Sequence, residues 1–139
     1  MALPDYYKIG ALNAFTTGIS GQDVANTVEY TGSEIDNTSS RYPYMVVEVV
    51  WIYSSTPTAN KTVELRILES VDGTNYEDTS RVIAAWSPPA DTGVTHRRVL
   101  LTAFPLLADK FKLAIKNVDT GQTITVTVRA WGYDMAVED

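Results

Sequence analysis

Residues 110–133 read KFKLAIKNVDTGQTITVTVRAWGY and alternate between apolar and polar side chains on both sides of an Asp-Thr-Gly tripeptide. The apolar side chains of the first half share one face: Phe111, Leu113 and Ile115. Those of the second half do the same: Ile124, Val126, Val128 and Ala130. A period of two with one apolar face predicts two half-buried antiparallel strands joined by a tight turn. Because such a hairpin is not stable alone in water, its apolar face must pack against another sheet.

Four further segments predict strands of the same sandwich. Residues 44–53 are rich in β-branched and aromatic side chains, which is typical of a central strand. Residues 61–69 alternate regularly, and the turn residues 71–75 lead into a returning strand at 80–86. A further strand is expected at 94–102. After it, residues 104–107 cross the sandwich to the final hairpin. The predicted fold is an all-β, jelly-roll-like antiparallel β-sandwich of about eight strands.

The first 43 residues are less regular than the rest of the chain. Clusters of Thr, Ser, Gly and Asn at 16–21 and 32–40 predict loops, with a short strand at 24–30. We therefore expect one domain, in which a loop-rich N-terminal arm with an edge strand (1–43) precedes the sandwich core (44–139). Either an arm across a neighbouring subunit or an ordinary edge strand with a long loop would have this composition.

Composition and charge narrow the possible functions. The 139 residues include no cysteine, which removes disulfides, thiolate metal sites and cysteine nucleophiles. Seventeen acidic against eleven basic residues give a net charge of -6, which argues against a nucleic-acid surface. No apolar run reaches the length of a membrane span, and the first residues do not resemble a signal peptide. We expect no nucleic-acid or membrane partner, and folding in a cytoplasm.

Structural roles explain the candidate catalytic and metal-binding residues better than a catalytic or metal-binding role does. Asp-Thr-Gly occurs at 91–93 and 119–121 and resembles the aspartic-protease motif, but the copies are too close to enclose a protease lobe, so turns are favoured. The single histidine, His96, has no partner at metal-ligand spacing and is expected on an exposed or interface face. Four loop residues carry oxygen atoms of the kind that bind calcium, but their spacing matches no EF-hand, so solvated loop residues are favoured: Asp23, Glu34, Asp36 and Asn37. The sequence thus predicts no enzyme, no metal and no cofactor.

Aromatic residues and two arginines are the candidate interface. Trp131 and Tyr133 share the polar parity of their strand, so the pattern places them outward, whereas Trp51 and Tyr53 share the face of Met45. Exposed aromatic side chains on a sheet suit a protein interface or a sugar platform, although a strand end covered by a loop explains them equally well. Arg97 and Arg98 are expected to form ion pairs with carboxylates, either on the surface of the same chain or on another subunit. The predicted interface set is Tyr6, Tyr7, Phe15, Trp51, Arg97, Arg98, Trp131 and Tyr133.

The order of segments resembles that of known viral proteins. LRILESVDGTNY (65–76), FPLL (104–107), KFKLAIKN (110–117), TGQT (120–123) and the strand 126–133 resemble small β-sandwich or jelly-roll virion proteins of tailed bacteriophages. These include head decoration (cement) proteins and tail or baseplate accessories. The resemblance implies an outer capsid protein, made in the bacterial host cytoplasm, that forms homotrimers and binds the major capsid protein or other virion subunits. A tail accessory or a carbohydrate-binding module is the alternative.

Overall fold

The computed structural model describes residues 6–9, 13–15, 17–39, 41–57, 62–87, 95–103, 110–133 and 135–138. In this part of the chain every regular element is a strand. The strands are β1 (Tyr6–Ile9), β2 (Asn13–Ala14), β3 (Ile19–Val24), β4 (Glu29–Asp36), β5 (Tyr44–Tyr53), β6 (Thr62–Ser70), β7 (Arg81–Trp86), β8 (His96–Ala103), β9 (Lys110–Val118), β10 (Ile124–Tyr133) and β11 (Met135–Glu138). None of these elements is an apolar helix of membrane-spanning length. The all-β prediction is confirmed.

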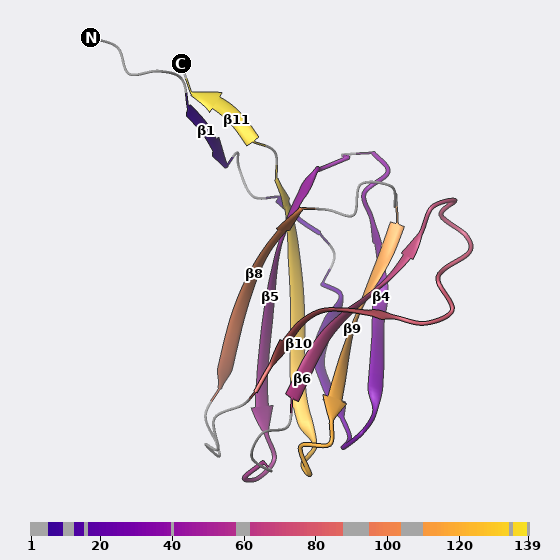
Figure 1. The fold of residues 1–139 in the computed structure, drawn as a ribbon, viewed down its shortest axis with the longest axis vertical. Coiled ribbons are helices and arrows are strands. Elements are labelled where there is room, and N and C mark those ends of the chain that lie inside the picture. Colours follow the sequence, from indigo (N-terminus) through magenta and orange to yellow (C-terminus); the bar gives the residue numbers. More distant parts are fainter. Residues whose placement is uncertain are drawn as a thin grey trace.

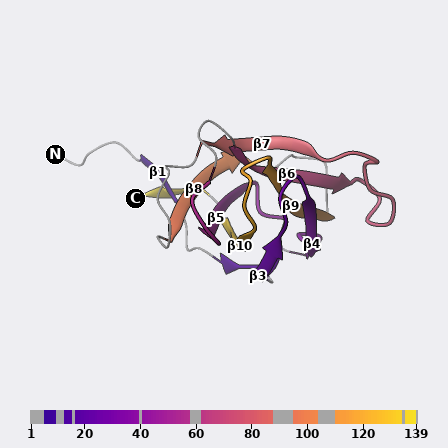
Figure 2. The same cartoon turned by 90° about the horizontal axis from the view of Figure 1, so that it is seen from below.

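Two antiparallel sheets form a sandwich. The first runs β2-β10-β5-β8, with β3 also paired to β10, and the second runs β4-β9-β6-β7. Figure 1 shows the strands of both sheets running along the long axis, and Figure 2 looks along that axis at the two layers. The long β5–β10 ladder pairs Tyr53 with Ile124 at one end and Tyr44 with Tyr133 at the other. The predicted antiparallel β-sandwich is therefore the observed fold.

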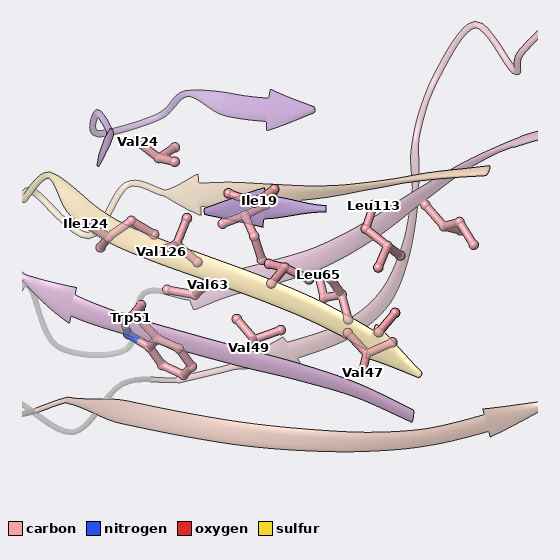
Figure 3. Close-up of a cluster of buried hydrophobic side chains, with 14 of the residues drawn as sticks. Ile19, Val24, Val47, Val49, Trp51, Val63, Leu65, Leu113, Ile124 and Val126 are labelled. Atoms are coloured by element: carbon pink, nitrogen blue, oxygen red, sulfur yellow. The ribbon is translucent and has the colours of Figure 1, made fainter. Parts of the chain in front are cut away.

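The core lies between the inner faces of the two sheets, as the alternation predicts. Figure 3 shows side chains from both sheets meeting in this layer. The first sheet contributes Met45, Val47, Val49, Ile124, Val126 and Val128, and the second contributes Val63, Leu65, Ile67, Phe111, Leu113 and Ile115. Each is almost completely buried. Burial of a side chain of this size stabilises the fold by about 1.5–3 kcal/mol relative to exposure, so these twelve residues supply the main driving force.

Residues 19–36 are built differently from the sequence prediction. The expected strand at 24–30 contains the turn between β3 and β4, where Thr27 adopts a φ of 66°. The expected loop at 32–40 is strand β4 as far as Asp36. Ile19, Val24 and Ile35 enter the core, so this part of the chain belongs to the sandwich. The predictions for residues 88–94 and 104–109, including one Asp-Thr-Gly tripeptide, fall outside the described residues.

The closing turn at 119–121 is held by a buried polar network. Asn117 Nδ2 donates to the carbonyl oxygens of Val24 (3.1 Å) and Gln122 (2.6 Å), and Asn117 Oδ1 accepts from the Thr120 hydroxyl (2.6 Å). Asn117 and Thr120 are both completely buried. The buried side-chain polar atoms of Asn117 and Thr120 are thus all hydrogen-bonded. This Asp-Thr-Gly tripeptide is a turn, as predicted, with positive φ at both Asp119 and Gly121.

Candidate assembly surface

The outer face of the first sheet carries an apolar row. We call it the apolar face, and it consists of Val46, Val50, Ile52, Val99 and Trp131. The ladders place Val46 beside Trp131, and Glu48 beside Val99. Val99 is 60% exposed, and Val50, Ile52 and Trp131 are half-buried. Val46 is only 9% exposed and Glu48 interrupts the row, so the exposed apolar surface is formed by Val50, Ile52, Val99 and Trp131. Apolar side chains on the solvent side of a sheet are typical of a surface that meets another protein.

The two arginines of the predicted interface lie on β8, the edge strand of this sheet, where Arg97 shares the parity of the outer face and Arg98 has the opposite parity. The Arg97 guanidinium lies 3.5 Å from a carboxylate oxygen of Glu48 on β5, and its side chain remains 63% exposed. Arg98 is exposed and donates a hydrogen bond to the Arg97 carbonyl oxygen (3.0 Å). The prediction that arginine meets a surface carboxylate is confirmed for Arg97, and both guanidinium groups remain accessible.

Trp51 and His96 are not on the surface, contrary to the prediction for both. Trp51 is 1% exposed and stacks on Trp86, with ring centroids 6.0 Å apart. His96 is 6% exposed, since its register opposite Trp51 turns it inward, and its ring lies 5.4 Å from that of Trp51. Tyr53 completes the cluster, and burial raises the pKa of its hydroxyl. These rings close one end of the core and leave no flat aromatic surface for a sugar.

Tyr133 is also covered, although its strand parity was predicted correctly. It shares the outer face with Tyr44, its partner in the β5–β10 ladder, and the two rings stack 5.4 Å apart at 19°. Tyr133 is therefore only 5% exposed. Of the aromatic residues predicted on the outer face of β10, Trp131 alone retains exposed surface.

Phe15 packs inward too, which differs from its predicted interface role. Its ring meets those of Tyr42 and Phe111 edge-on, at 5.9 Å and 6.2 Å. A Cβ at Gly132 would overlap the Tyr42 ring, so glycine is what allows this ring to lie on β10. For Tyr6 and Tyr7 the structure defines the backbone, which forms β1.

Strand β1 pairs with β11 in a two-stranded ribbon, and we call this pair the ribbon. Tyr6 lies opposite Glu138, and Ile9 lies opposite Met135. The same two stretches of chain pair again as β2 and β10, where Asn13 lies opposite Gly132. The ribbon thus continues the β2–β10 ladder with a shift of one residue, and Figure 1 shows it projecting beyond the end of the sandwich. Sequence alternation could not reveal it, because each strand has only four residues.

The four calcium candidates serve separate contacts. Asp23 accepts a hydrogen bond from Thr125 (2.6 Å), Asp36 accepts one from the Thr38 backbone (2.8 Å), and Asn37 binds the Tyr42 backbone. The Tyr76 hydroxyl donates to Glu34 and lowers the pKa of that carboxyl. Within the described ranges, no three His, Asp or Glu side chains gather where a metal ion could bind.

Comparison with known proteins finds other structures with the same sandwich fold. No protein-family model and no characterised protein sequence matches this chain. Among solved structures, it is similar to a chain of infectious bursal disease virus, Gx strain (TM-score 0.54, 10% identity, 94% of this chain and 32% of the other). It is also similar to the enzymatically active domain of tailspike protein 4 of bacteriophage CBA120 (TM-score 0.53, 11% identity, 89% of this chain and 19% of the other).

A third similarity is to the xylanase 10B of Clostridium thermocellum, solved as CBM22-1 and GH10 modules with xylohexaose (TM-score 0.50, 14% identity, 94% of this chain and 30% of the other). The chain spans about a third or less of the length of each of these structures. Two of the three come from viruses, and all three share the arrangement of the sandwich.

Proposed function

We propose that this protein is a non-enzymatic structural protein of a bacteriophage virion, and specifically a decoration protein that binds and stabilises the outer surface of the head. The apolar face carries the proposal. A sheet whose solvent side holds Val50, Ile52, Trp131 and a 60%-exposed Val99 has surface to bury against another subunit. The partner in this proposal is the major capsid protein or another head subunit, and a homotrimer is the binding unit.

Two further properties support this role. The net charge of -6 suits the outside of a head, because the inside faces packaged DNA, whose phosphates repel an acidic protein. The sandwich architecture is also present in the similar chains from two viruses. With neither a clustered metal site in the described residues nor a nucleophile motif in the sequence, we assign no reaction, cofactor, nucleic-acid partner or membrane partner.

Capsid binding tests the proposal, with Val99→Glu as the decisive variant. Wild-type protein should co-sediment with expanded empty heads of the source phage and raise their melting temperature. A carboxylate at position 99 would be buried against the head without a partner, so we expect at least ~10-fold weaker binding.

Val82→Glu is the matched control for this variant. Val82 is 46% exposed, but it lies on β7 of the other sheet. We expect it to bind heads as the wild type does. Absence of head binding by the wild type, or equal loss in both variants, would reject the apolar face as the docking surface.

Trp131 supports the carbohydrate-binding alternative, since it is a partly exposed aromatic ring on the same face. This chain is also similar in fold to the xylanase, which was solved with xylohexaose. A monomer that binds a glycan array, with binding abolished by Trp131→Ala, would favour that alternative. Binding to isolated tails but not to heads would move the protein to the tail.

A further inference from the structure

The ribbon has a free edge that its own chain does not cover in the described structure. Strand β11 pairs with β1 along one side, and no described strand pairs with its other side. A two-stranded ribbon is only marginally stable in water, and an additional strand would satisfy the exposed N–H and C=O groups of β11. The free edge of β11 can therefore pair with an edge strand of another sheet, and this pairing would stabilise the ribbon.

The sandwich offers such an edge at β8. Strand β8 has β5 as its neighbour on one side, and no described strand pairs with the other side. Its eight residues, His96–Ala103, form a longer strand than the four of β11. Pairing at this position would extend the first sheet by one strand without disturbing an existing ladder.

Charge distinguishes β8 from the other edges. Strand β11 includes Glu138, and the sequence places Asp134 before it and Asp139 after it. Edge strand β4 is acidic (Glu29, Glu34 and Asp36) and β3 contains Asp23, so both would repel it. Arg81 on edge strand β7 is already paired with Glu69 and Glu77.

On β8, by contrast, Arg97 and Arg98 are both exposed, and Arg97 makes only a 3.5 Å contact with one carboxylate among the described residues. Opposite charges on neighbouring strands stabilise their pairing, and like charges destabilise it.

The position of the ribbon means that the two edges belong to different copies. Figure 1 shows the ribbon leaving the sandwich at the end where β8 finishes. Arg97 and Arg98 lie near the start of β8, at the opposite end of a strand about 25 Å long. The ribbon points away from the arginines of its own copy, so only those of a second copy are available to it.

We propose that β11 of one copy pairs antiparallel with the open edge of β8 in a second copy, and that this pairing brings Glu138 opposite Arg97. The donor and acceptor edges lie on every copy, so one contact can repeat around a closed ring. This contact joins copies to each other, and it goes beyond the proposed docking to the head through the apolar face.

Cysteine cross-linking tests the pairing directly, because the chain contains no cysteine of its own. Ala136→Cys protein is mixed with Val99→Cys protein and treated with a short bis-maleimide, which tolerates a small error in register. We expect a covalent dimer that contains one of each variant, identified by mass spectrometry. Thr31→Cys, at an exposed position on the acidic edge strand β4, is the control and should give at least ~5-fold less dimer with Ala136→Cys.

Charge reversal is the second test. Arg97→Glu should weaken self-association at least ~10-fold in analytical ultracentrifugation, and adding Glu138→Lys should restore much of it. A monomeric wild type, equal cross-linking to Thr31→Cys, or dimers formed only between two Ala136→Cys chains would overturn the proposal. Head binding through the apolar face is measured separately and could survive any of these outcomes.

Discussion

Gly132 determines how closely the Tyr42 ring can approach β10. A Cβ at this position would overlap Cδ2 and Cγ of the Tyr42 ring and would lie 3.0 Å from Cζ of Phe15. Gly132→Ala should therefore force both rings to shift, at a cost of about 1–3 kcal/mol in the free energy of unfolding. Urea denaturation of the wild type and the variant measures this difference.

Gly18→Ala is the matched control, since a Cβ there would meet its nearest neighbours at an ordinary 3.7 Å. We expect this variant to remain within about 0.5 kcal/mol of the wild type. Similar losses from both substitutions would mean that backbone freedom, rather than contact with Tyr42, explains the glycine at 132.

Asp72 makes the β6–β7 loop sensitive to acid. Its carboxylate accepts hydrogen bonds from the Asn75 backbone (2.7 Å), the Asn75 side chain (2.8 Å), the Thr74 backbone (2.8 Å) and the Ser70 hydroxyl (3.0 Å). These donors, the Asn75 backbone above all, lower the pKa of Asp72 well below its usual range. A pKa that is lower in the folded state stabilises the fold above the unfolded pKa of ~3.9, and this contribution is lost as the pH falls.

We therefore expect the wild type to lose more stability than Asp72→Asn between about pH 5 and pH 2. Thermal melts of both proteins across this range provide the measurement. NMR titration of the Asp72 carboxyl gives an independent reading, and a midpoint near the ordinary value of ~3.9 would contradict the prediction.

At the scale of elements, alternation identified the strands whose inner faces fill the core. Strands β5, β6 and β10 place an apolar side chain at every second position, so their existence and orientation were predictable from residues 44–53, 61–69 and 124–133. Strand β4 was missed because it is an edge strand in which Ile35 alone is fully buried, and a polar edge strand has the same composition as a loop.

The same limit explains the lysines of β9. Alternation places these charges on the polar side of their strand, but it does not show that β9 lies between β4 and β6 rather than at an edge. Lys110 instead lies 3.5 Å from Glu34, and the Lys112 ammonium lies 4.3 Å from the centre of the Tyr76 ring. Alternation shows which side of a strand a residue occupies, but not whether that side is covered. Tyr133 was misplaced for this reason, because Tyr44 covers it on the outer face.

At the scale of the whole molecule, the ribbon and the sandwich are separable. Strands β1 and β11 pair with each other and lie outside the two-layer body in Figure 1. Removal of residues 1–9 together with 134–139 should leave the melting temperature of the sandwich within about 2 °C of the wild type, because no core residue is lost. Differential scanning calorimetry of the dilute protein checks this. A fall of more than about 5 °C would show that the ribbon stabilises its own sandwich.

The positions of the two ribbon strands in the chain also determine when the ribbon can form during synthesis. Strand β1 leaves the ribosome first among the elements, and its partner β11 leaves after every strand of the sandwich. Until then β1 has no partner from its own chain, so a nascent protein with a nearly finished body still lacks the strand that would join a neighbour. Under the proposed pairing of β11 with β8, translation would thus delay contact between copies until each sandwich is complete.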